Sequence, residues 1–357
     1  AVATFYLFMT QVIYNRTYNH NIHDHEHMYR LEIYGDIFGY KWGSEVCRPF
    51  VTLVKEIPQV KDAVYVSPYV NNINVKVDNH TIKVPLITMC KPGMEFFTGK
   101  LLSGSSKTFG DGPNVIINRS TAEKMFGTAN AAGKTFETVN DDGSTTPITV
   151  VGVSEDMPDN CTLPNGLYVS DKGNWMTDWN EWSYNVYLRL DKSANPKKVE
   201  RAIKLAMMKA HGLSEKDEKE FDKEAKVKLR ISPVDDIYFS GVGKQDKGNR
   251  NLVGVLTVAS VFVLFIAMLN LLNFSLSEIP MRMRGINTRR VMGASIGSLR
   301  LKMIMENVMF AFVALLIGIV LVIAFQRSET CMKLVSGDIH FASHMVLTVV
   351  MAVSALV

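Results

Sequence analysis

Two long apolar runs in the last third of the chain are separated by a short basic segment. The first run, Leu252–Leu276, holds 25 residues without a charge, and 16 of them are Leu, Ile, Val or Phe. Each of these side chains contributes about 0.3 to 0.6 kcal/mol to insertion into a bilayer. A helix of this length, at about 1.5 Å per residue, crosses the hydrocarbon layer. The pattern therefore predicts a membrane-spanning helix over 252–276.

The segment between the two runs, residues 278–302, predicts the orientation of the chain. It carries six basic residues against one acidic residue, Glu278. Lysine and arginine concentrate in cytoplasmic loops, because each cation costs about 2.5 to 3.5 kcal/mol at the bilayer centre. We therefore expect a cytoplasmic loop over 278–302. The large preceding region, residues 14–250, is then expected on the extracytoplasmic side of the membrane.

Three more apolar stretches complete the expected membrane part. Residues 303–325 would return to the outer face, and residues 1–13 and 345–357 would be the remains of two further spanning helices, giving about four in all with the first and last truncated. A secretory signal peptide is the alternative for residues 1–13, although no basic residues precede them. Glu306 lies four residues after Lys302, so the two can pair near the cytoplasmic boundary.

Residues 14–250 alternate between strand and helix patterns. Two-residue periodicity predicts strands over 29–34, 63–69, 82–89, 114–118, 149–154, 184–190 and 227–232. Helices are expected over 44–57 with Ser44 as N-cap and Pro58 as stop, over 120–126 before Gly127, and over 195–211 from Asn195 and Pro196. The predicted fold is an α+β domain of two βα units with an inserted, mostly β subdomain at about 70–183, attached to an α-helical membrane domain over 251–357.

Charge excludes one class of partner. Residues 1–251 hold 31 basic and 31 acidic side chains, whereas residues 252–357 hold 8 and 4. Nucleic-acid binding needs clustered cations that the evenly mixed region lacks.

The four cysteines, Cys47, Cys90, Cys161 and Cys331, show no CxxC spacing. They are expected to be small buried residues, although an extracytoplasmic setting permits a disulfide between two of the first three.

The sequence offers few candidates for chemistry, and we predict no enzyme, cofactor or resident metal. Four histidines crowd one short segment beside two acidic residues: His20, His23, His25 and His27. Imidazoles at this density occur in zinc and copper sites, but the spacing is not HExxH and no distant fourth ligand is suggested, so a solvated, membrane-proximal loop is favoured. No Walker motif is present, since the Gly-Lys-Thr at 133–135 follows a helix pattern and has the wrong spacing.

Several short motifs, in this order, resemble one known family, the FtsX-like or MacB-like permease subunits of ABC transporters. In residues 14–250 they are Tyr18, His23, Tyr29, Arg30, Glu95-Phe96-Phe97, Leu101–Gly104, Val115–Asn118, Ala122–Gly127, Gly133-Lys134-Thr135, Val151-Gly152-Val153, Asp156 and Pro158. In the membrane half they are Leu269–Ser275, Arg289–Ser295 and Glu306. Family members often carry Glu and Gly before the arginine-rich turn, where this chain has Gly285 and Asn287.

The resemblance implies a cytoplasmic-membrane permease that works with a separate cytoplasmic ABC ATPase, acts as a homodimer or paired permease, and passes movement to its extracytoplasmic domain. Residues expected to face the ATPase, or anionic headgroups, are Arg282, Arg284, Arg289, Arg290 and Gly293. Those expected to support helix contacts within the bilayer are Asn270, Asn273 and Glu306. The alternative, to which we give equal weight, is that the four arginines only keep the segment in the cytoplasm and anchor it to lipid headgroups.

The functional hypothesis is thus mechanical coupling of ATP hydrolysis to export, lipoprotein release or control of a cell-wall enzyme, with a possible extracytoplasmic protein partner. A membrane-anchored sensor or partner-binding protein that uses no ATP is the alternative.

Overall fold

The computed structural model divides the chain into two units: a helical unit, residues 1–16 and 249–357, and a sheet unit, residues 17–248. The structure describes residues 2–78, 80–139, 144–170, 177–218, 220, 226–244, 246–293 and 295–328. The expected helix over 345–357 and Cys331 lie outside these residues.

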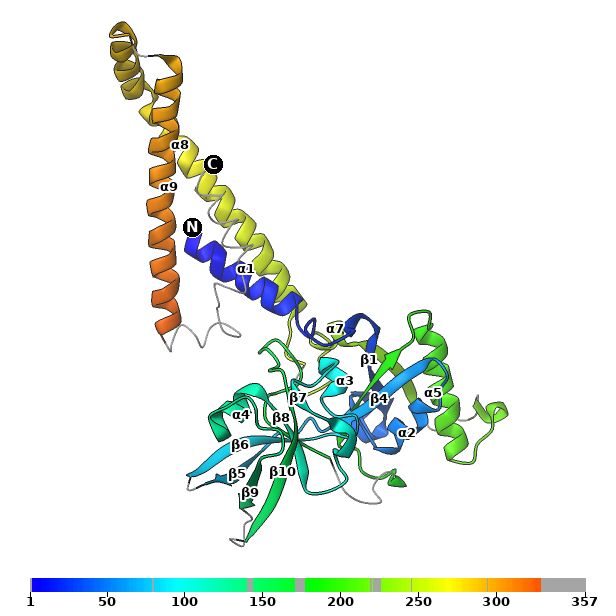
Figure 1. Ribbon diagram of the computed structural model, residues 1–357. Helices are drawn as coiled ribbons and strands as arrows, with labels where there is room; N and C mark the ends of the chain where they lie inside the picture. The colour runs from blue at the N-terminus through cyan, green and yellow to red at the C-terminus, as the bar shows by residue number, and fades with distance from the viewer. Residues whose placement is uncertain are drawn as a thin grey trace. The chain divides into compact units, whose positions relative to one another are not determined.

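The sheet unit contains two sheets, which are seen in Figure 1. The six-stranded sheet contains β1 (Met28–Gly35), β2 (Lys41–Gly43), β3 (Glu45–Val46), β4 (Val60–Val66), β12 (Tyr184–Leu190) and β13 (Lys228–Pro233). Within the described residues its strands pair antiparallel, and β1 lies between β12 and β13. Helices α2 (Pro49–Lys55) and α5 (Pro196–Ala210) contact each other and strands of this sheet. The early and late elements of the unit thus build one α+β layer, as the sequence predicts.

The seven-stranded sheet forms the β subdomain. Its strands are β5 (Asn71–Val77), β6 (His80–Thr88), β7 (Ser103–Gly104), β8 (Asn114–Asn118), β9 (Thr135–Val139), β10 (Thr145–Ser154) and β11 (Leu167–Val169). Because β9 pairs with both β5 and β10, the strands close into a ring, and β7 pairs with β10 outside that ring. Helix α4 (Arg119–Phe126) contacts β8 and β10, while the short helices α3 (Glu95–Thr98) and α7 (Val234–Ile237) lie in connections. A buried apolar cluster that includes Val75, Ile117 and Leu167 fills this subdomain.

The helix expected over 44–57 is wrong in its first part. Residues Glu45–Val46 pair with β12, and the helix begins only at Pro49. Pairing satisfies backbone groups that the expected first turn would have used, and proline suits the first helical position because its missing N–H has no partner there. Arg48, not Ser44, is the residue that precedes the helix, which ends at Lys55 before Pro58.

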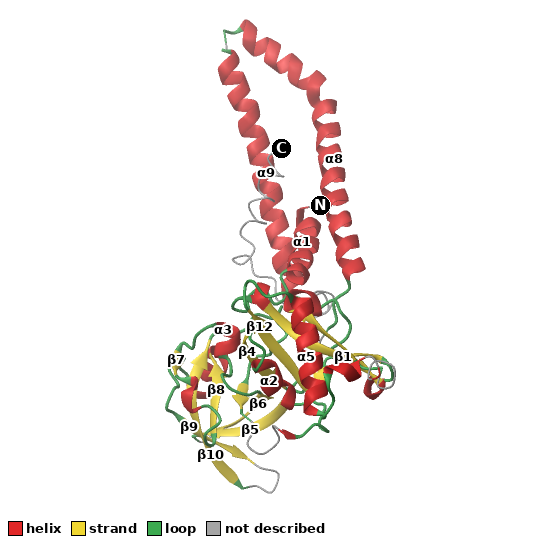
Figure 2. Cartoon of the chain, turned by 90° about the vertical axis from the view of Figure 1, so that its right-hand side faces the viewer, coloured by secondary structure: helices red, strands yellow, loops and turns green. Residues whose placement is uncertain are grey.

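Helices α1 (Val2–Arg16), α8 (Arg250–Val291) and α9 (Ile296–Arg327) form the helical unit. Figure 2 shows α1 between the lower parts of α8 and α9, and α1 contacts both. Arg250–Met281 and Ile296–Arg327 are each long and apolar enough to cross a membrane, and most of their side chains are exposed within the described chain. Exposure distinguishes them from the buried core helices of soluble proteins. The segment 278–302, expected as a loop, is instead helical over residues 278–291 and 296–302.

Cys47, Cys90 and Cys161 are free and buried, which confirms the expectation of small core residues. Burial raises the pKa of the Cys47 thiol to about 12 and those of Cys90 and Cys161 to about 11. The thiolate is the nucleophile, so these thiols should react poorly near neutral pH.

In a Cys331→Ser background, we expect a maleimide at pH 7.5 to label the folded protein at least about a hundredfold more slowly than a free thiol, and to label three cysteines after denaturation. Mass spectrometry measures the labelling. Fast modification of any of the three in the folded protein would contradict their buried placement.

Candidate coupling surface

The turn that joins α8 to α9 is built from a helix end, a glycine and an N-cap. The N–H of Met292 donates to the carbonyls of Thr288 and Arg290, and Gly293 follows with a φ of +89°. This left-handed backbone conformation is one that glycine adopts without the steric cost of a Cβ atom. Ser295 then caps α9 by accepting a hydrogen bond from the N–H of Ser298 at 3.2 Å. Gly293 therefore lets two long helices reverse direction within four residues.

Basic residues flank this turn on both helices. Arg289 and Arg290 lie on the last turn of α8, and Arg300 lies on the second turn of α9; all three are exposed. The cations at the end of α8 are also favourable beside the negative end of its helix dipole. Arg282 and Arg284 belong to the same stretch of α8, but their side chains lie outside the described part of the structure. The described cations form a positive surface at the α8–α9 turn.

A shallow groove of about 160 Å³ lies between the end of α8 and the start of α9. Its walls come from Gly285, Ile286 and Arg289 on one helix and from Leu299, Lys302, Met303 and Glu306 on the other. The sequence predicts Arg289 and Glu306 as site residues but not their apolar neighbours. The spacing could have revealed them. Gly285 and Arg289 are four residues apart, as are Leu299 and Met303, so each pair shares one face of its helix.

Lys302 Nζ lies 3.7 Å from Glu306 Oε1, in the i,i+4 arrangement that the spacing predicts. Both side chains are more than a third exposed, so the pair contributes only about 0.3 to 0.5 kcal/mol. Its main effect is to neutralise the one carboxylate of the groove. The surface as a whole can therefore bind an acidic protein face or anionic lipid headgroups.

Pro280 lies inside α8 between the apolar run and the basic end. Proline cannot donate a backbone hydrogen bond and its ring crowds the preceding turn, so helices bend at such positions. Figure 2 shows that the upper part of α8 changes direction before the turn into α9. The basic surface is thus carried on a short helical arm.

Asn270 and Asn273 lie on the apolar part of α8, and both are exposed. The described structure of a single chain does not bring them to a helix interface. Their expected role in helix contacts remains a prediction that concerns lipid or other copies of the chain.

The comparisons with known proteins cover both halves of the chain. Residues 7–206 match the MacB-like periplasmic core domain, and residues 257–357 match the FtsX-like permease C-terminal domain. No curated protein matches the chain.

Solved structures of permease or transporter domains are among those similar to the chain. A domain of a protein described as a permease from Porphyromonas gingivalis is 20% identical and covers 59% of this chain and 92% of its own, with a TM-score of 0.47. The periplasmic region of MacB from Actinobacillus actinomycetemcomitans is 14% identical and covers 61% of this chain and 92% of its own, with a TM-score of 0.39. The extracellular domain of the noncanonical ABC-type transporter YknZ from Gram-positive bacteria is 15% identical and covers 57% of this chain and 99% of its own, with a TM-score of 0.38.

The first of the two family matches alone spans more than half of the chain, and the second begins within α8 and includes the basic turn. The chain therefore belongs to the ABC-transporter permease family that combines a MacB-like periplasmic core domain with an FtsX-like permease domain.

Proposed function

We propose that the chain is a permease subunit that couples a separate cytoplasmic ABC ATPase to mechanical work on the outer side of the cytoplasmic membrane. The observation that supports this most directly is the length of α8, which runs from Arg250 through the apolar stretch to the basic end at Val291. A helix moves as a stiff element, and helix shifts are a common means of switching between states. Displacement of the basic arm would be passed along α8 to Arg250.

The groove and its rim form the surface to which the ATPase would bind. Exposed Arg289 and Arg290 would attract acidic side chains, and the apolar floor formed by Ile286, Leu299 and Met303 would receive an apolar one. Complementary charge steers a partner and fixes its register, while a buried apolar anchor supplies most of the affinity.

Recovery of the permease from native membranes into nanodiscs tests this function. We expect an ATP-binding chain to copurify with it and the ATPase activity of that chain to depend on the permease. Recovery of the permease without any ATP-binding chain, under conditions that preserve other membrane complexes, would argue against coupling. That result would favour the sensor or anchoring function.

The exposed apolar side chains on the spanning helices require a covering of lipid or of other helices. Val255, Phe262 and Phe265 on α8 are all more than half exposed. We propose that part of this surface contacts a second permease, with Asn270 and Asn273 forming hydrogen bonds across the contact. Such bonds contribute about 0.6 kcal/mol each on average, so they would adjust an association that apolar contacts drive.

Orientation is tested with a cysteine placed at Gly285. A Cβ at this glycine would meet no atom within 4 Å, so Gly285→Cys fits without strain. The three buried native cysteines give little background, and Cys331→Ser removes the fourth. We expect a membrane-impermeant maleimide to label the probe only after the cells are opened. Labelling from outside intact cells would overturn the proposed cytoplasmic location, whereas a cysteine at exposed Lys76 serves as the outward-facing control.

A further inference from the structure

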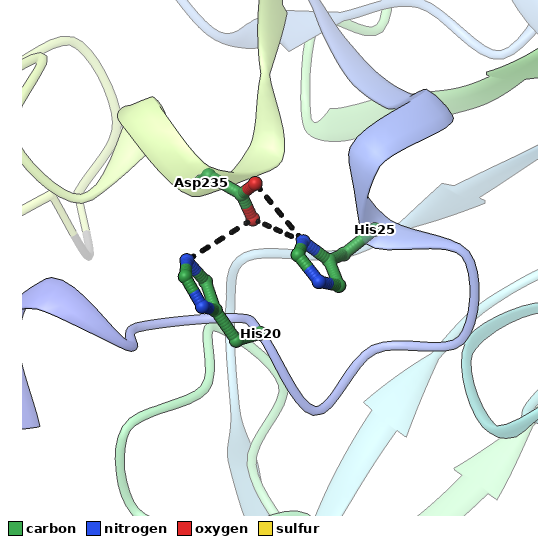
Figure 3. Close-up of side chains that lie close together, drawn as sticks. All are labelled: His20, His25 and Asp235. Carbon is green, nitrogen blue, oxygen red and sulfur yellow. Dashed lines mark hydrogen bonds and ion pairs between the residues drawn. The ribbon is translucent and has the colours of Figure 1, made fainter.

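The four histidines near the start of the sheet unit are separated by the fold into two groups and a single residue. His20 and His25 both approach Asp235, which comes from α7 more than 200 residues later (Figure 3). His27 forms a separate pair with Asp24, at 2.8 Å. His23 instead lies against Gly99. The fold thus brings a carboxylate from a distant part of the chain to two of the histidines, a contact that the sequence pattern did not reveal.

We propose that His20, His25 and Asp235 bind a divalent transition-metal ion of the zinc type. Two imidazoles and one carboxylate are a ligand set that suits zinc, cobalt or nickel and not the all-oxygen preference of calcium and magnesium. One ligand atom from each residue lies within 4.8 Å of the others. Three protein ligands leave a fourth position of a tetrahedral ion open to water.

The distances are close to those of a loaded site. His25 Nδ1 lies 2.9 Å from Asp235 Oδ1, and His20 Nε2 lies 3.9 Å from the same oxygen. Ligand atoms about 2.1 Å from a tetrahedral ion are about 3.3 to 3.4 Å apart, a value that falls between these two distances. The two imidazole rings are stacked, with centroids 4.7 Å apart. His20, the most exposed of the three, must turn its ring out of the stack to share the ion.

The backbone beneath the cluster is held by buried contacts. Asn19 Nδ2 donates to the carbonyl of Val234 at 2.8 Å, directly before Asp235. The rings of Tyr18 and Tyr238 are stacked at 3.8 Å. Val234 and Ile237 of α7 are fully buried, so Asp235 projects from an anchored turn. Such support keeps ligands in place before the ion arrives.

The charge around Asp235 also favours an ion. Among the described residues, the ion pairs of its carboxylate are with the two imidazoles and not with a lysine or arginine. A metal cation would satisfy the carboxylate and both imidazole nitrogens at once. The ion would also link the two ends of the sheet unit. His20 and His25 follow α1 near the start of the unit, and Asp235 precedes α8 near its end.

Titration of the detergent-solubilised protein with zinc tests the site. Affinity-tag histidines are removed, and the protein is stripped with EDTA and dialysed. We expect one zinc ion per chain by calorimetry, a rise in Tm with zinc, and the absorption of tetrahedral cobalt when Co²⁺ replaces zinc. His20→Ala, His25→Ala and Asp235→Asn should each weaken binding at least about tenfold.

His27→Ala is the matched control, because this residue lies in the same segment but outside the cluster, and it should bind zinc as the unaltered protein does. Tm in EDTA shows that each variant is folded, and His20→Gln, at an exposed position, tests the site with the least structural change. The proposal is overturned if zinc binds only at millimolar concentration, if the three ligand variants bind normally, or if His27→Ala loses as much affinity as they do.

Discussion

Replacing Arg289 and Arg290 together by glutamate is expected to abolish ATPase-coupled activity while the protein still inserts in the membrane. The change reverses the charge at the end of α8, where both side chains are exposed and Arg289 forms one wall of the groove. An acidic ATPase surface would then meet like charge, which costs several kcal/mol and lowers the association rate. Insertion should persist because Arg282, Arg284, Arg300 and Lys302 still hold the segment in the cytoplasm.

Copurification of the ATPase chain and permease-dependent ATP hydrolysis are the two measurements. Lys197→Glu with Arg201→Glu is the matched control, since it reverses the same amount of charge on the exposed side of α5, where the ion pairs are solvated. We expect the control to keep coupling. Normal activity in the Arg289 and Arg290 variant would remove these residues from the coupling surface and support a topology role alone.

Replacing Arg30 by methionine is expected to destabilise the sheet unit by about 3 to 5 kcal/mol, because it leaves the buried carboxylate of Asp246 without its cation. The Arg30 guanidinium, 1% exposed, forms two hydrogen bonds to Asp246 at 2.9 and 2.6 Å and one to Glu32 at 2.7 Å. Glu32 is itself fully buried and also binds Arg230 at 2.7 Å. The bidentate geometry makes this the strongest kind of ion pair available to the chain.

Thermal unfolding in detergent, followed by tryptophan fluorescence, measures the effect as a large drop in Tm. Lys76→Met is the matched control, because the Lys76–Glu137 pair is nearly half exposed with its atoms 3.9 Å apart, and its loss should cost less than about 1 kcal/mol. Equal Tm values for the two variants would mean that the Arg30 network does not hold the unit together.

The same network predicts how stability depends on pH. Burial raises the pKa of Asp246, but the hydrogen bond and charge of Arg30, together with hydrogen bonds from the Ser240 hydroxyl and the Gly243 N–H, hold that pKa below its ordinary value. A carboxyl with a lowered pKa in the folded state contributes stability that is complete above its unfolded pKa of about 3.9 and is lost as the pH falls through the folded value. The Tm difference between the unaltered protein and Arg30→Met should therefore shrink below about pH 4. A difference that grows on acidification would contradict this sign.

Local composition and periodicity predict several elements well, including two strands that are almost entirely buried on both faces. Tyr184–Leu190 and Asn114–Asn118 form strands with the predicted bounds, and the helix from Pro196 is capped by Asn195 as expected. Six strands were not predicted, namely β2, β3, β5, β7, β9 and β11. β5 alternates at Ile73, Val75 and Val77, a usable signal, whereas β11 has only three residues and depends on its neighbours on both sides.

The sequence by itself predicted the two long apolar helices, the basic segment between them and the alternation of strand and helix, because hydropathy, charge and periodicity act over a few residues. Only the tertiary structure decided which distant residues meet. Arg30 reaches Asp246 across 216 positions, and His25 reaches Asp235 across 210. Such contacts follow from the order and register of strands in a whole sheet, where β1 is held between β12 and β13. That order reflects the summed burial of many side chains, which no local stretch of sequence records.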